Sequence, residues 1–184
     1  MKATRILTLV AVVAALLAGL AGSAVSSRTN PYRLPGAPSA LIGGAASIDG
    51  LLVEFLDALA RSDARALDAL RVNEAEYRGL IVPGSVEAGR PPQVLSEEAS
   101  EYFWETLHTK SSYGRQSLLS GFGGRRLEIV SVTFEKGVKQ WANHRAHRRL
   151  RLVVRDESGE ERELATGSIA ELDGRFKFIS FIRD

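Results

Sequence analysis

Apolar residues recur at helical spacing immediately after residue 47. Six of them between positions 48 and 59 lie three or four residues apart, which predicts a helix that Ser47 or Asp49 caps. Asp63 follows a short interruption and is typical of an N-cap for a second helix over residues 64–70. The region after residue 47 therefore begins with two successive helices, the second of them short.

Two more helical segments follow. Asn73 starts a further turn or two that ends before Pro83-Gly84. Ser96 opens a longer helix, with two glutamates in its first turn that favour the helix dipole. The pattern loosens over residues 111–114, resumes, and stops at the glycines of 121–124.

The hydrophobic period changes from 3.6 to 2 after this glycine cluster, which predicts an antiparallel meander. Asp173-Gly174 is a strong signal for a two-residue hairpin, and Glu157-Ser158-Gly159 suits a three-residue turn. These turns pair Ile169 with Phe178 and Leu152 with Leu164. The predicted strands are 127–134, 147–156, 161–172 and 175–182.

The register assigns each strand residue to one of two faces, because successive side chains point to opposite sides. The face expected to meet the helices carries Leu150, Leu152, Val154, Leu164, Ile179 and Phe181. Its centre holds small or polar residues, which either leave a pocket or are filled by Trp104 or Phe103. The polar residues of that face are Thr166 and Ser168, with His144 and Arg148 toward one end.

The opposite face is expected to carry an unusual apolar cluster around a histidine. Apolar patches of this kind often mark partner surfaces. We therefore predict that a second subunit, or the loop 136–143 with Trp141, covers it, and that the protein self-associates as a homodimer or larger homo-oligomer. The candidate interface residues are His147, Ile169, Phe176 and Phe178.

The N-terminal residues predict export. Lys2 and Arg5 precede a short apolar stretch and small residues, which together describe a signal peptide over residues 1–26. The competing interpretation is an uncleaved signal anchor, which would hold the protein at the membrane. Residues 27–47 are rich in proline and glycine and predict a flexible linker before a domain over 48–184.

Composition excludes several classes of protein. The chain of 184 residues has no cysteine, so it carries no disulfide, thiol nucleophile, lipidated cysteine or cysteine-based metal site. Residues 49–109 hold 12 acidic and 5 basic residues, whereas residues 125–155 hold 9 basic and 2 acidic residues. We expect the acidic helices and the basic strand to pack together, rather than the basic strand to bind nucleic acid.

The order of helix, Ser-Asp turn, short helix, longer helix and antiparallel strands resembles the nuclear transport factor 2-like superfamily. The segments that carry the resemblance are LLVEFLDALARSDARALDAL (51–70) and LATGSIAELDGRFKFISFI (164–182). The resemblance implies an α+β fold in which N-terminal helices pack on a curved sheet of four or more strands around a cone-shaped cavity. Some members are isomerases, dehydratases or hydrolases, and many others bind ligands or assemble without catalysis.

The chemistry of a cavity enzyme requires a base with a tuned pKa, and no acidic residue lies in the middle of the predicted inner face. We therefore identify no catalytic residue and expect no cofactor. His144 and His147 lie on opposite faces of a strand, so we expect no metal site. The speculative ligand-binding residues are His144, Arg148, Ser168, Thr166, Trp104 and Tyr77.

The sequence favours a noncatalytic domain, periplasmic or secreted, that binds a small molecule or a protein partner. An enzyme of isomerase, dehydratase or hydrolase type is the first alternative. A structural component of an envelope assembly is the second, favoured by an uncleaved N-terminal helix.

Overall fold

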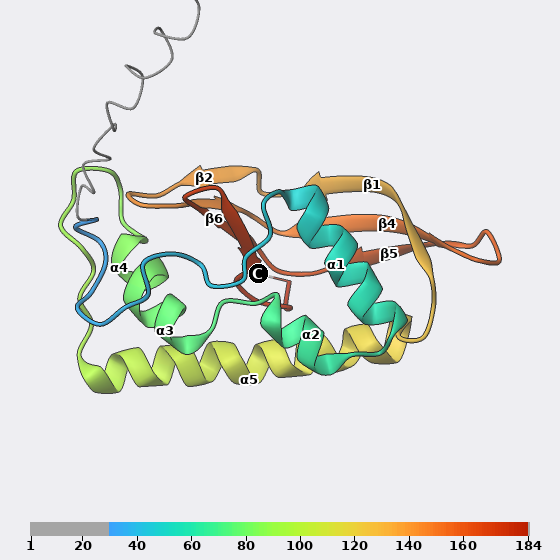
Figure 1. The fold of residues 1–184 in the computed structure, drawn as a ribbon, viewed down its shortest axis with the longest axis horizontal. Helices are drawn as coiled ribbons and strands as arrows, with labels where there is room; N and C mark the ends of the chain where they lie inside the picture. Colours follow the sequence, from blue (N-terminus) through green and yellow to red (C-terminus); the bar gives the residue numbers. More distant parts are fainter. Residues whose placement is uncertain (1–29, 184) are drawn as a thin grey trace, which may run out of the picture.

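A long helix runs along one side of the molecule, and two β-sheets and five shorter helical segments lie above it (Figure 1). The computed structural model describes residues 30–183 and has an α+β fold. The predicted signal peptide, residues 1–26, lies outside the described residues. The helical segments are α1 (Ile48–Ala60), α2 (Ala64–Ala69), α3 (Glu74–Glu76), the π-helix η1 (Tyr77–Ile81), α4 (Val82–Gly84) and α5 (Glu97–Phe122).

Polar caps start these helices where the sequence predicts them. The side chains of Ser47, Asp63 and Ser96 accept backbone N–H groups at the starts of α1, α2 and α5. Asn73 forms a reciprocal capping box with Glu76. Helix α5 continues without interruption through residues 111–114, so the loosened pattern there marks a change of contacts rather than a break.

The strands form two antiparallel sheets instead of one. Strands β1, β4 and β5 make a three-stranded sheet in that order, and β2, β3, β6 and β7 make a four-stranded sheet. The predicted pairs Leu152–Leu164 and Ile169–Phe178 are confirmed. The strands are β1 (Leu127–Phe134), β2 (Val138–Gln140), β3 (Arg145–His147), β4 (Leu150–Asp156), β5 (Glu161–Ala165), β6 (Ile169–Leu172) and β7 (Arg175–Phe178).

Two local breaks divide the predicted continuous strands. Arg149, between β3 and β4, has a positive φ of 56°. Gly167, between β5 and β6, packs so closely that a Cβ there would lie 2.2 Å from the Ser180 Oγ. Leu150 still exchanges backbone hydrogen bonds with this segment, through Thr166 N and Gly167 O. The two sheets are therefore joined at the break, and beyond it β4 and β6 pair within different sheets.

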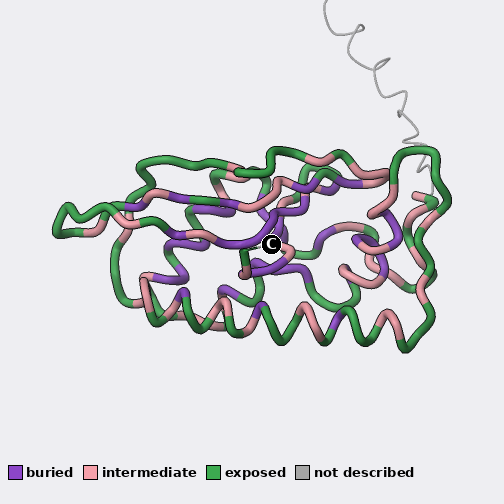
Figure 2. Tube along the Cα trace, turned by 180° about the vertical axis from the view of Figure 1, so that it is seen from behind, coloured by how far each residue is buried: buried purple, intermediate pink, exposed green. Residues whose placement is uncertain are grey.

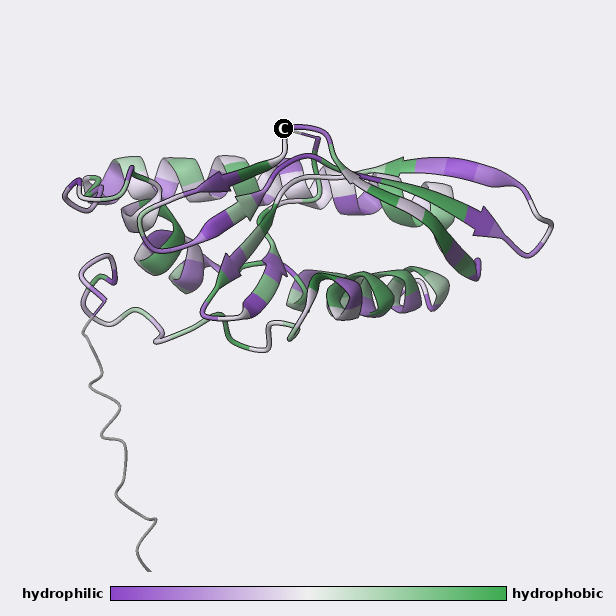
Figure 3. Ribbon diagram, turned by 90° about the horizontal axis from the view of Figure 1, so that it is seen from above, coloured by the Kyte–Doolittle hydropathy of each residue, from purple (hydrophilic) through white to green (hydrophobic). Residues whose placement is uncertain are grey.

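The main core lies between α1 and both sheets, and α1 stands to one side of the strands when the molecule is seen from above (Figure 3). The fully buried side chains of α1 are aliphatic apart from Phe55. They meet the predicted inward residues of β4 and β5. The strand residues of this core include Leu150, Leu152, Val154, Leu164, Ile169 and Phe178, together with Phe181.

The predicted assignment of residues to faces is wrong for β6 and β7, beyond the break at Gly167, although Phe181 lies in the main core as predicted. Ile169 and Phe178 are completely buried in the main core, on the same side as Leu164. The predicted alternation of faces runs unbroken through residues 166–168, but the chain leaves strand conformation there. The side chains of β6 therefore point to the face opposite to the predicted one. These two residues therefore do not form an exposed patch on the far side of the sheet.

The other members of that predicted patch contact the edge of the core. His147 packs between Phe134 and Phe176, with ring centroids 5.3 and 6.1 Å away. Its Nε2 lies 2.9 Å from Glu171 Oε2. The loop 136–143 does not cover Ile169 or Phe178, since its β2 segment extends the sheet alongside β3 and its Trp141 lies against His144.

A second, smaller core covers the other face of the four-stranded sheet. Ala170 and Leu172 of β6 contact Leu80 and Ile81 of η1 there. Leu41, which is 3% exposed, completes the contact. Residues 30–47, the N-terminal strap, thus pack against the domain more closely than the proline and glycine content predicts.

Helix α5 is exposed along most of its length (Figure 2). Only Trp104, Ser111 and Leu118 are buried along its 26 residues. Ser111 Oγ accepts the backbone N–H of Phe181 at 2.9 Å. No helix in the described range 30–183 is long and apolar enough to cross a membrane.

The basic strand residues find their partners within the sheets. Arg151 pairs with Glu163 at 2.7 Å, and Arg155 pairs with Glu161 at 2.6 Å. Arg145 pairs with Glu171 across the next ladder. The expected neutralisation of this strand by the acidic helices is therefore replaced, for these arginines, by cross-strand pairing.

Candidate functional site

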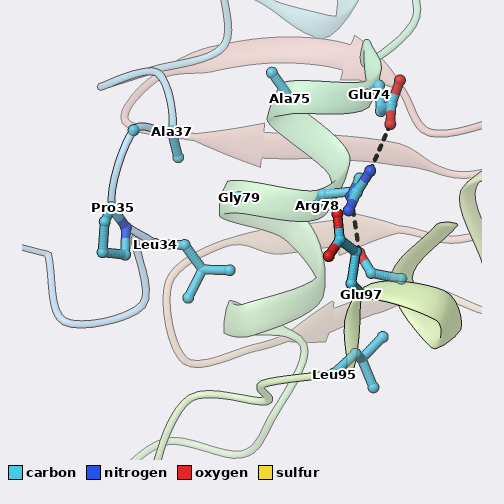
Figure 4. Close-up of a pocket in the computed structure, with 11 residues that line it drawn as sticks. Leu34, Pro35, Ala37, Glu74, Ala75, Arg78, Gly79, Leu95 and Glu97 are labelled. Atoms are coloured by element: carbon cyan, nitrogen blue, oxygen red, sulfur yellow. Dashed lines mark hydrogen bonds and ion pairs between the residues drawn. The ribbon is translucent and has the colours of Figure 1, made fainter.

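A cleft of 580 Å³ opens between the N-terminal strap, the α3–η1 segment and the start of α5 (Figure 4). Apolar side chains form the wall contributed by the strap and by Leu95, which precedes the N-cap of α5. Polar side chains come from α3, η1 and the first turn of α5. The lining residues used below are Leu34, Ala37, Glu74, Arg78, Leu95 and Glu97.

Arg78 is the central polar side chain of the cleft. Its Nη1 donates to Glu74 Oε1 at 2.7 Å, and its Nε donates to Ser100 Oγ at 2.9 Å. These two bonds hold the guanidinium between η1 and α5, as the dashed lines in Figure 4 show. Glu97 adds a second carboxylate at the same side of the cleft. The cleft thus joins charged groups to an apolar wall.

The strap is held against η1 by close backbone contact. Leu34 N donates to Gly79 O at 3.1 Å. A Cβ at position 79 would lie 2.3 Å from the Ala37 Cβ, so only glycine allows this approach. Gly79 therefore determines where the wall of the cleft stands.

An aromatic pair lies beside the cleft. Tyr77, the first residue of the π-helix, and Trp104 of α5 have ring centroids 5.7 Å apart. Burial raises the pKa of the Tyr77 phenol above its usual value. Single-turn π-helices occur often at functional sites, and this one turns Tyr77 toward α5.

Arg71 lies behind this pair. Its side chain is 5% exposed, its guanidinium stands 5.2 Å from the Trp104 ring centre, and its Nη2 contacts His108. Arg71, Arg78 and His108 are not among the site residues that the sequence predicts. Their grouping joins positions distant along the chain, which no local motif could indicate.

The structure separates most of the predicted ligand-binding residues. Tyr77 and Trp104 come together beside the cleft. His144 is buried in the loop before β3, where its Nδ1 donates to Asn143 Oδ1 at 2.6 Å, and burial lowers its pKa to about 4. Arg148 donates instead to the backbone of Lys136 at 2.7 Å.

The remaining two, Thr166 and Ser168, are buried at the break between the sheets. Ser168 Oγ accepts the backbone N–H of Arg149 at 3.4 Å. Thr166 Oγ1 has no hydrogen-bond partner within residues 30–183. The hydrogen bond of Ser168 thus links the two breaks, at residues 149 and 167.

Three phenylalanines fill the space between α1 and the sheets. Phe178 stands 4.9 Å from Phe55 and 5.2 Å from Phe181, measured between ring centroids. The predicted occupants of this space lie elsewhere, since Trp104 contacts Tyr77 and Phe103 is 47% exposed on α5. The cleft, rather than this filled interior, is therefore the candidate ligand site in the described residues.

Metal ligands do not gather in the part of the chain that the structure describes. Across residues 30–183, no three His, Asp or Glu side chains come close enough to hold an ion.

Comparisons with protein-family models, with curated proteins and with solved structures gave no significant match.

Proposed function

We propose that this chain is an exported, noncatalytic domain of the nuclear transport factor 2-like type that binds a small molecule in the cleft of Figure 4. The observation that carries the proposal is the cleft itself. Its 580 Å³ falls within the range of about 300–1,000 Å³ typical of small-molecule sites. Its mixed lining provides apolar contact from Leu34 and orientation from Arg78 and Glu97.

The chemistry of the described residues supports binding over catalysis. An efficient general base has a pKa near the working pH. His144 is buried and has a polar partner, but a pKa of about 4 makes it a poor base at neutral pH. The three phenylalanines, with the Phe178 ring tilted against the other two, occupy the interior where a cavity enzyme would place its substrate.

A fragment screen by two-dimensional NMR on labelled protein tests the ligand site. We expect fragments that combine an apolar ring with a polar group to shift the amide signals of Ala75, Gly79 and Ser100. Ala75→Trp places a large side chain in the cleft and should abolish these shifts. Ala69→Trp, at an exposed position of α2, is the matched control. Fragments that still bind the Ala75→Trp variant would locate the site elsewhere.

Export forms the second part of the proposal and rests on residues 1–26. Mass spectrometry of protein recovered outside the cytoplasm tests it. A chain that begins near residue 27 supports a cleaved signal, whereas an intact Met1 in the membrane fraction supports the signal anchor and favours the envelope-component alternative.

Self-association is a second candidate function, favoured by one edge of the three-stranded sheet. Strand β1 pairs only with β4 and exposes Val130 and Val132 by about 40% each. A groove of 640 Å³ separates it from Val53 of α1. Sedimentation velocity tests this function, because Val132→Lys should shift an oligomer to monomer without unfolding it.

A further inference from the structure

Arg71 follows α2, and its guanidinium reaches the surface of α5. The side chain is 5% exposed, which is rare for an arginine unless an acid is paired with it. Burial accordingly lowers its pKa from the usual value. A buried guanidinium requires acceptors for its N–H groups, because an unmet donor is costly.

The acceptors around Arg71 are incomplete. Its Nη2 donates to the Nδ1 of His108 at 2.9 Å. Its Nη1 is buried and has no acceptor in the described part of the chain. Asp68, the carboxylate whose charge acts on Arg71, is hydrogen-bonded to Arg115. Two arginines thus share one aspartate, which leaves one positive charge in excess.

The guanidinium is nevertheless held in a fixed position. Its plane lies over Trp104, which in turn contacts Tyr77. The His108 ring also packs against Trp104, with centroids 5.5 Å apart, but His108 itself is exposed on α5. Because His108 is exposed and belongs to neither hydrophobic core, its side chain can be displaced without a change in the packing of either core.

We propose that a small carboxylate binds Arg71 at the position that the His108 ring now occupies. Its two oxygens would accept from Nη1 and Nη2 in the forked geometry that arginine and carboxylate share. The carboxylate supplies the acceptor that Nη1 lacks and balances the excess charge beside Arg115. A carboxylate oxygen carries a negative charge, unlike an imidazole nitrogen, and charge-assisted bonds are the stronger kind.

This site is separate from the proposed cleft, which Arg71 does not line. Ser100, Trp104 and His108 follow one another along α5 at intervals of one turn. The carboxylate site therefore lies two turns of α5 beyond Ser100, and either site stands if the other fails.

Trp104 provides a direct readout. The chain contains two tryptophans, so the full chain with Trp141→Phe has Trp104 as its only indole. We would titrate sodium acetate into this protein against sodium chloride at constant ionic strength. The expected result is a saturable change in Trp104 fluorescence with acetate and none with chloride.

Two variants separate the site from general salt effects. Arg71→Lys keeps the charge but loses the fork, and should weaken acetate binding about tenfold, the equivalent of one lost hydrogen bond. His108→Ala removes the competing acceptor at an exposed position, and should tighten binding several-fold. Lys110→Ala, exposed on the same helix, should leave binding unchanged.

Three results overturn the proposal. The first is an equal response to acetate and chloride. The second is saturation by phosphate or sulfate without saturation by acetate, which would exclude the carboxylate. The third is unchanged acetate affinity in His108→Ala, a variant that should fold whatever happens to Arg71→Lys.

Discussion

Glu76 and Lys177 form an ion pair that is buried on both sides. Lys177 Nζ lies 2.9 Å from Glu76 Oε2, and the side chains are 4% and 0% exposed. The backbone N–H groups of Ile42 and Asn73 also donate to the Glu76 carboxylate, and Lys177 donates to Ile42 O. The pair therefore fastens three separate parts of the chain, the strap, α3 and β7, at one point.

Removing one partner of this pair should be far more damaging than removing both charges. Lys177→Met leaves the Glu76 charge buried without its cation, and we expect a loss of about 3–5 kcal/mol of unfolding free energy. Urea denaturation measures the loss. The double variant Glu76→Gln, Lys177→Met should recover part of it, and a double variant less stable than Lys177→Met would contradict this explanation.

The close contact between Gly79 and Ala37 should make position 79 intolerant of a methyl group. Gly79→Ala forces the strap away from η1, and we expect about 1–3 kcal/mol of destabilisation together with shifted NMR signals for residues 34–37. Gly121→Ala is the control, because nothing lies within 4 Å of a Cβ there. It should be neutral or slightly stabilising, since alanine favours helix.

His144 should make the protein less stable as the pH falls below neutral. Its folded pKa of about 4 lies below the usual 6.5, so the neutral ring stabilises the fold above pH 6.5. That contribution is lost as the unfolded state takes up the proton, by about 2 kcal/mol at pH 5 and about 3 kcal/mol at pH 4.

Urea midpoints at pH 7 and pH 5 measure this effect against the variant His144→Gln. The variant keeps a side-chain donor for Asn143 but does not titrate. The difference in stability between wild type and variant should shrink as the pH drops. A pH-independent difference would show that the ring is not held neutral.

The phenylalanine cluster should dominate the stability of the core. Phe178→Ala removes a ring that contacts Phe55 and Phe181, and we expect a loss of about 3–5 kcal/mol. Phe103→Ala, with its ring 47% exposed on α5, should cost under about 1 kcal/mol. Thermal unfolding of the two variants compares them directly, and equal losses would argue against a packed interior between α1 and the sheets.

The sequence predicts features that depend on neighbouring residues. Ser47, Asp63 and Ser96 begin helices because their side chains cap local N–H groups, and Asp173-Gly174 makes the hairpin that pairs Ile169 with Phe178. The α+β class follows from the change of period.

The division into two sheets has no comparable local signal in the sequence. It depends on the positive φ of Arg149 and on the contact of Gly167 with Ser180, which lies 13 positions later. The missed break reverses the predicted faces of β6 and β7, which brings Ile169 and Phe178 into the core, whereas Phe181 lies on its predicted inner side. The contact between Arg71 and His108, 37 positions apart, likewise has no local signature.

The exposed helix α5 should detach before the rest of the molecule unfolds. Helix α5 buries Trp104, Ser111 and Leu118 and packs Leu119 and Phe122 partly against the core, so most of its 26 residues lose no buried contact when it detaches. Its amide protons should exchange with solvent through a partial unfolding that leaves α1 and the strands intact. The rest of the molecule would then stay folded while α5 detaches, and the fluorescence of Trp104 would report each detachment.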